Sequence, residues 1–174
     1  MQQNSILIIN GSAACVDQDL DAIHELIGEL PRDYMAIGLD AVDKHYWPIK
    51  YMATFHPAEL PLIIQRRRDY GGNIDYEVIS HEPRETVKHF ISDWWKPSGS
   101  SALLGVQAAI TRLGYKKIIL CGCPMTGFNE KNNNYANFQQ GWKARLKEVG
   151  DNVRSMSGWT MELLGAPTKE WLNQ

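Results

Sequence analysis

The sequence predicts a single α/β domain whose mostly parallel sheet of five or six strands carries helices on both faces. Several short apolar runs are continuous rather than alternating with polar residues, as expected for strands that are buried on both faces. Segments with apolar residues at helical spacing separate these runs, which is typical of a doubly wound sheet. With 174 residues, 44% of them hydrophobic, the chain is long enough to bury a core without disulfides or metals.

Apolar runs and turn residues define the individual elements. The expected strands cover residues 5–10, 34–39, 50–55, 74–80 and 116–122. The expected helices cover residues 17–30, 60–70, 101–113 and 134–149. Residues 82–97 fit either a helix or an irregular cover, because Val87, Phe90 and Ile91 would share one helical face. Residues 1–174 are therefore expected to form one domain, with 151–174 as a C-terminal tail that packs on it.

The charge balance limits the classes of partner. The chain has 18 lysines and arginines and 20 aspartates and glutamates, a net charge of −2. A balance this close to neutral favours neither a nucleic acid nor a membrane surface. The sequence has no apolar stretch of about 18 residues and no secretory signal at its start, so we expect a cytoplasmic protein. The run Arg66-Arg67-Arg68 fits solvated cations at a helix C-terminus, with a phosphate clamp as the alternative.

The three cysteines, Cys15, Cys121 and Cys123, are too few and too odd in number for a disulfide framework. Cys121 and Cys123 could together hold a soft metal, but zinc favours four ligands and a two-residue gap between paired cysteines. We interpret both as small buried residues, and we predict neither a metal nor a cofactor.

Candidate ligand-binding residues follow from the sheet geometry, because ligands of an open parallel sheet bind at the carboxyl ends of its strands. At these ends lie Asn10, Gly11 and Ser12 after the first strand, Asp40 after the second, His56 after the third, and Pro124 and Met125 after the fifth. The loop of Ser98, Gly99, Ser100 and Ser101 precedes an apolar helix and is expected at the same edge.

The four small residues from Ser98 to Ser101 are the strongest indication of function. The first amides of a helix lack intrahelical partners and carry partial positive charge, so an uncrowded helix start can bind an anion. Gly99 would let a phosphate or carboxylate approach the backbone, and Ser100 and Ser101 would add hydroxyl donors. The alternative is an ordinary serine N-cap behind Pro97.

The loop Asn10-Gly11-Ser12 has a similar pair of interpretations, a phosphate site or a tight turn. It lacks the Gly-x-Gly-x-x-Gly pattern of dinucleotide-binding proteins.

Four other residues have candidate roles. His56 could act as a general base or contact a ribose or phosphate, although a lone histidine is more often structural. Asp40 lies where a carboxylate would receive a ribose hydroxyl. Arg154 and Trp159 could fold over the crevice, binding an anion and stacking on a base. Alternatively, their segment packs over the sheet edge.

The stretch SGSSALLGVQAAITRLGYKKIILCGCPM, residues 98–125, resembles the bacterial oligosaccharide sialyltransferases and the wider Rossmann-like families related to them. The opening ILIINGSAACVD looks like the first strand and loop of that group. The combination of His56-Pro57, Pro124-Met125 and RSMSGWT is similar to small, uncharacterised phage-encoded proteins. The resemblance implies a Rossmann-like fold and assigns nucleotide contacts to Gly11, Ser12 and the loop from Ser98 to Ser101.

Two functions fit these observations. The first is a nucleotide or nucleotide-sugar binding protein, which as an enzyme would be a glycosyl or nucleotidyl transferase with His56 as its base. The alternative is a non-catalytic phage accessory protein that binds a small nucleotide ligand or a host protein. It is favoured by six tryptophans that could form a partner surface and by the lack of any histidine after His89. A homo-oligomer is left open.

Overall fold

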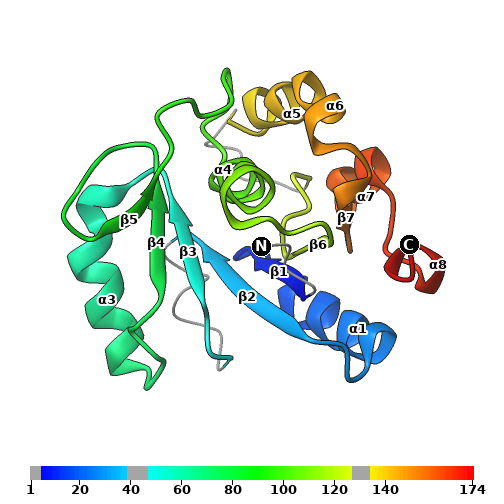
Figure 1. Ribbon diagram of the computed structural model, residues 1–174, viewed down its shortest axis with the longest axis horizontal. Coiled ribbons are helices and arrows are strands. Elements are labelled where there is room, and N and C mark those ends of the chain that lie inside the picture. Colours follow the sequence, from blue (N-terminus) through cyan, green and yellow to red (C-terminus); the bar gives the residue numbers. More distant parts are fainter. Residues whose placement is uncertain (1–4, 39–46, 127–133) are drawn as a thin grey trace.

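A parallel sheet organises the protein, whose computed structural model describes residues 5–38, 47–126 and 134–174. Across these residues, seven strands form one sheet in the order β5-β4-β3-β2-β1-β6-β7 (Figure 1). They are β1 (Ile6–Asn10), β2 (Arg32–Ile37), β3 (Tyr51–Thr54), β4 (Glu77–Ser80), β5 (Val87–Phe90), β6 (Ile118–Cys121) and β7 (Val153–Ser155). Each neighbouring pair is parallel. The predicted α/β fold is confirmed, with more strands than the five or six expected.

Helices cover both faces of this sheet. They are α1 (Val16–Ile27), the 3₁₀ turn η1 (Pro57–Glu59), α3 (Leu60–Asp69), α4 (Ser101–Ala108) with its π-helical extension η2 (Ala109–Leu113), α5 (Asn134–Ala144), α6 (Leu146–Val149), the 3₁₀ turn η3 (Gly150–Asn152), α7 (Gly158–Leu164) and α8 (Lys169–Leu172). Side chains of α1, α3 and α8 pack on one face, and those of α4 and α5 pack on the other. The doubly wound arrangement is therefore as predicted.

The two faces hold separate apolar cores, because successive strand residues point to opposite sides of a sheet. In β1, Leu7 and Ile9 join the core on the α4 face, whereas Ile6 and Ile8 join the core on the α1 face. All four are 5% exposed or less. A strand that is covered on both sides must be apolar throughout, which explains the continuous run in the sequence.

Of the two interpretations of residues 82–97, the helix was wrong: β5 occupies Val87–Phe90, and the rest of the range is irregular. β5 pairs with β4 across a register shift between Val78 and Ile79 and forms one edge of the sheet. The helical interpretation needed Phe90 and Ile91 on one buried face. Instead Phe90 is 45% exposed and Ile91 is fully buried, which is the alternation of an edge strand.

The segment from residue 151 onward contributes β7, which forms the other edge of the sheet by pairing with β6. Behind it, the buried Trp171 ring lies 4.5 Å from Lys117 Nζ and 5.2 Å from the Arg154 guanidinium. The indole Nε1 donates to the Asp151 carbonyl at 2.7 Å. These contacts fasten the C-terminal segment to the sheet edge, one of the two arrangements that the sequence left open.

The helices expected over residues 101–113 and 134–149 lie within those bounds, but neither is a continuous α-helix. The helix expected over residues 101–113 is α-helical only as far as Ala108 and ends as η2, with Gly114 in the left-handed conformation at φ 77°. The helix expected over residues 134–149 breaks at Arg145 into α5 and α6.

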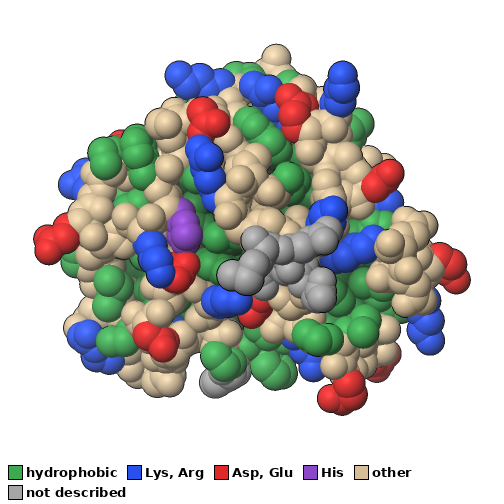
Figure 2. Space-filling view, viewed as in Figure 1, with side chains coloured by type: hydrophobic (Ala, Val, Ile, Leu, Met, Phe, Trp, Pro, Cys, Tyr) green, Lys and Arg blue, Asp and Glu red, His purple; other side chains and the backbone are tan. Residues whose placement is uncertain are grey.

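On the face shown in Figure 2, acidic and basic side chains are interspersed rather than gathered by sign.

The direction of strand order reverses at β1, which pairs with β2 on one side and β6 on the other. After β1 the chain enters α1 on one face, whereas α4 on the opposite face leads into β6. Connections that diverge in this way leave a crevice at the carboxyl edge of an open sheet.

Candidate functional site

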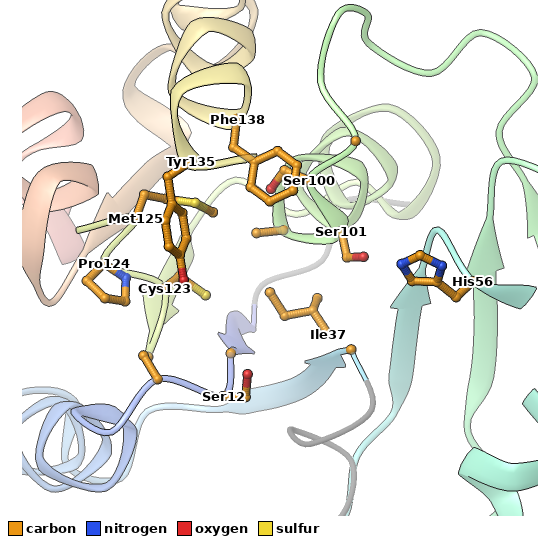
Figure 3. Close-up of a pocket in the computed structure, with 16 residues that line it drawn as sticks. Ser12, Ile37, His56, Ser100, Ser101, Cys123, Pro124, Met125, Tyr135 and Phe138 are labelled. Atoms are coloured by element: carbon orange, nitrogen blue, oxygen red, sulfur yellow. The ribbon is translucent and has the colours of Figure 1, made fainter. Parts of the chain in front are cut away.

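A pocket of about 400 Å³ opens at this reversal point on the carboxyl edge (Figure 3). Its walls come from the loops after β1, β2, β3 and β6, from the first turn of α4 and from α5. Its volume lies within the usual range for small-molecule sites, about 300–1,000 Å³. The pocket therefore lies where a ligand of this fold is expected and has room for one.

Most of the residues expected at the site line this pocket. They are Gly11, Ser12, His56, Gly99, Ser100, Ser101, Pro124 and Met125. Asn10 and Ser98 lie behind the pocket wall, at 0% and 2% exposed. Arg154 and Trp159 are not among the described lining residues, and Asp40 lies outside the part of the chain that the structure describes.

The serines before α4 each satisfy one backbone amide. Ser100 is the N-cap of α4, because its Oγ accepts from the Leu103 amide at 3.3 Å. Ser98 Oγ accepts from the Ser100 amide at 3.1 Å. Ser101 Oγ accepts from the Phe55 amide at 3.4 Å and so joins α4 to the loop after β3. The N-cap interpretation thus holds for Ser100, and among the described residues neither the Ser100 nor the Ser101 hydroxyl donates a hydrogen bond.

Two backbone amides at the start of α4 remain open. Within the described residues, neither the Ser101 nor the Ala102 amide has an acceptor at hydrogen-bond distance. The first turn of α4 contains no acidic residue, so nothing in the helix itself neutralises its positive end. Beyond its chain neighbours, a Cβ at Gly99 would meet only the Phe138 ring, at 3.7 Å. The missing side chain of Gly99 therefore leaves space in the pocket.

The loop after β1 is a tight turn held against β6. The Gly11 amide donates to the Cys121 carbonyl at 2.8 Å, and the Ala13 amide donates to the Gly122 carbonyl at 3.3 Å. A Cβ at Gly11 would lie 2.2 Å from the Gly122 carbonyl oxygen, so the approach of the two loops requires glycine. Because these amides are already bonded, the tight-turn interpretation describes this loop. The Ser12 side chain extends from it toward the pocket (Figure 3).

Asn10 ends β1 with a fully buried carboxamide. Among the described residues, neither its Oδ1 nor its Nδ2 has a hydrogen-bond partner. Strand alternation places its side chain with Ile6 and Ile8 on the α1 face. Asn10 therefore does not line the pocket, whose apolar wall belongs to the α4 face.

His56 stands exposed at the rim of the pocket. Its backbone amide donates to Thr54 Oγ1 at 2.8 Å, which fixes the loop after β3. The imidazole and the Ser101 hydroxyl face each other across the opening (Figure 3). No hydrogen bond joins the ring to a carboxylate in the described ranges, so His56 has the position of a base but no partner that orients it.

Arg154 and Trp159 take part in the packing of the C-terminal segment. Arg154 Nη1 donates to the Val153 carbonyl at 2.8 Å, and its guanidinium lies against Trp171. Trp159 packs on the core of the α4 face, with Lys143 Nζ 5.7 Å from its ring. This is the edge-packing arrangement that the sequence offered as the alternative.

The segment around Ser157 and Thr160 holds the loop after β6 in place. Thr160 Oγ1 donates to the Cys123 carbonyl at 2.7 Å, and Ser157 Oγ donates to Asp19 Oδ2 at 2.8 Å. Asp19, in α1, also accepts from the Gly122 amide at 2.8 Å and is only 6% exposed. These bonds connect α1, the loop after β6 and the start of α7 at one wall of the pocket.

The sequence did not predict the aromatic wall, because Tyr135 and Phe138 have the helical spacing of a buried stripe with Trp142. Only Trp142 is fully buried, whereas Tyr135 is 38% exposed and both Tyr135 and Phe138 line the pocket. Their rings meet edge to face at 6.4 Å and 84°. The place of these two residues in the chain could have indicated that they line the pocket, because α5 follows the loop after β6 and its first turns lie over the carboxyl edge.

Cys121 and Cys123 are buried thiols. Burial raises the pKa of both, that of Cys123 to about 12, and the nearby Asp19 carboxylate raises them further. Burial also raises the pKa of the half-buried Cys15, against the effect of its hydrogen bond with Ser157. Among the described residues, no three His, Cys, Asp or Glu side chains are grouped so that they could hold a metal.

We expect the native thiols to react very slowly with iodoacetamide at mildly alkaline pH, because only the thiolate is an effective nucleophile. Cys15 should be modified first, and Cys121 and Cys123 only after unfolding. Mass spectrometry of the labelled protein gives the site and rate, and labelling in concentrated guanidinium chloride is the control for all three. Native labelling of Cys123 as fast as free cysteine would contradict the assignment.

Comparison with known proteins finds no matching family model, curated protein or solved structure. In the described ranges, no helix combines the length and apolar character needed to cross a membrane. The fold and the site define a doubly wound α/β protein with a ligand-sized pocket at the carboxyl edge of its sheet, and the functional conclusion rests on that geometry.

Proposed function

We propose that this protein binds a nucleotide or nucleotide sugar in the carboxyl-edge pocket, with a phosphate group at the start of α4. The observation that carries the proposal is the pair of open amides at Ser101 and Ala102 in the lining of a cavity of about 400 Å³. Open amides and the positive end of a helix together favour an anion. The hydroxyls of Ser100 and Ser101 supply further donors beside them.

The aromatic wall beside the start of α4 favours a ring system on the same ligand (Figure 3). Tyr135 and Phe138 present aromatic surface to the pocket, and Phe138 lies close to Gly99. Stacking of a nucleobase on an aromatic side chain contributes about 1–3 kcal/mol. A ligand with a phosphate and a base would therefore contact both features at once.

A transfer reaction is the second candidate function, favoured by the placement of His56. His56 supplies an imidazole in the described lining, and histidine is the side chain that most often acts as a general base. Because no carboxylate of the described residues orients its ring, binding is the primary proposal and group transfer the extension of it.

A thermal-shift screen of nucleotides and nucleotide sugars, at matched ionic strength, tests both functions. A ligand at about 100 times its Kd adds about 2.7 kcal/mol to the free energy of unfolding, which raises the melting temperature by several degrees. The ligand is then recovered after incubation. Recovery unchanged supports a binding protein, and a product that is lost in His56→Ala supports a transferase. If no compound raises the melting temperature at millimolar concentration, the proposal is wrong.

A further inference from the structure

We propose that Asp19 restricts this pocket to ligands with a single phosphate group, because it closes the start of α1 to a second one. The inference rests on the proposed function and adds which anions the site rejects. Asp19 would act as a specificity-determining residue through its charge and through the backbone donor that it occupies.

The starts of two helices meet at the pocket and differ in charge. Ser12 and Ala13, which lead into α1, line the same cavity as the first turn of α4. In open α/β sheets the helix after the first strand is the usual phosphate site. Here the first turn of α1 contains Asp17 and Asp19, whereas the first turn of α4 contains no acid. Asp17 is exposed and screened by water, so the buried Asp19 is the acid that offsets the positive end of α1. The positive end of α4 has no such acid.

The contacts of Asp19 bring its charge to the pocket wall. Its Oδ2 accepts from the amide of Gly122, a lining residue, and from the Ser157 hydroxyl, both at 2.8 Å. The carboxylate is thus hydrogen-bonded to the pocket wall. It occupies the Gly122 amide, which an anion in the pocket could otherwise use. The amides of Gly11 and Ala13 are bonded to β6 and its loop, so neither is available to an anion.

The charge of Asp19 is poorly screened, because the residue is only 6% exposed and charges interact more strongly away from water. The described lining of the pocket contains no lysine or arginine that would offset it. One phosphate is compensated at α4, but a second phosphate toward α1 would meet the charge of Asp19, of which the positive end of α1 offsets only about half. Repulsion of this kind selects between ligands that otherwise share the same contacts.

Inorganic phosphate and pyrophosphate, measured by calorimetry at constant ionic strength, test the inference without assuming a base. In the wild type, pyrophosphate should bind no more tightly than phosphate. Asp19→Asn keeps an oxygen that can accept from Gly122 and Ser157 but removes the charge. We expect it to raise the affinity ratio of pyrophosphate to phosphate about tenfold. Asp17→Asn is the matched control, since it removes an equal charge from an exposed residue of the same turn and should change the ratio less than about twofold.

Two results would overturn the role of Asp19. One is an Asp19→Asn ratio within about twofold of the wild type, and the other is a wild-type preference for pyrophosphate of about tenfold or more. The second needs no variant, so the test stands even if Asp19→Asn does not fold. If phosphate binds but Asp19→Asn leaves the affinity ratio of pyrophosphate to phosphate unchanged, only the role of Asp19 is wrong. A wild type that binds neither ion removes this inference together with the phosphate site of the proposed function.

Discussion

Ser101→Asp is expected to abolish phosphate-dependent binding without destabilising the protein. The substitution places a carboxylate at the first position of α4, where the phosphate of the ligand is expected. Two like charges about 4 Å apart repel by about 4 kcal/mol near a protein surface, so the affinity should fall on the order of 1,000-fold. The free energy of unfolding should stay constant or rise by about 0.3–1 kcal/mol, because an acid is favourable at a helix N-terminus.

Ser101→Asn is the matched control, since asparagine has the size of aspartate without its charge. Both side chains keep an oxygen that can accept from the Phe55 amide, as Ser101 Oγ does. Calorimetry with inorganic phosphate and with any nucleotide found in the screen gives the affinity, and thermal melting gives the stability. If Ser101→Asp binds as tightly as Ser101→Asn, the phosphate does not lie at the start of α4.

Gly11→Ala is expected to lower the free energy of unfolding by about 3 kcal/mol or more. The added Cβ would lie 2.2 Å from the Gly122 carbonyl oxygen and 2.7 Å from Cys123 Sγ. Since the first of these is backbone, the loops after β1 and β6 must separate, which weakens the bond from the Gly11 amide to Cys121. Overpacking alone typically costs about 1–3 kcal/mol, and the strained hydrogen bond adds to it.

Gly99→Ala serves as the comparison for Gly11→Ala. Its Cβ would meet only Phe138 at 3.7 Å, which is ordinary contact, and its backbone is not in the left-handed region. The free energy of unfolding should therefore change by less than about 0.5 kcal/mol. Urea denaturation of both variants provides the measurement. Equal losses for the two glycines would show that the close packing between Gly11 and Gly122 does not hold in solution.

The central strands could be predicted from the sequence because a strand that is buried on both faces has a continuous apolar run. β1 and β6 are covered on both faces, so every position in them except Asn10 is apolar or small. β5 and β7 could not be predicted in this way, because they have four and three residues and lie at the sheet edges. Their strand conformation comes from pairing with β4 and β6, a tertiary effect that overrides local preference.

The site could be predicted in outline because the carboxyl ends of parallel strands meet at one edge. The sequence could not distinguish the structural roles of the pocket residues Gly11 and Gly99. Gly11 is required by a close backbone approach, whereas Gly99 borders open space. Nor could the sequence show which helix start is open to an anion. That depends on the bond between Asp19 and Gly122, which are 103 residues apart in the chain.

Amide NMR during a phosphate titration tests the central claim most directly. The ¹H and ¹⁵N resonances of every backbone amide are followed as inorganic phosphate, and then a nucleotide, is added at constant ionic strength. The account predicts that the Ser101 and Ala102 amide protons shift downfield together and saturate with the Kd measured by calorimetry. Saturable binding that moves other resonances and leaves these two unchanged would contradict it.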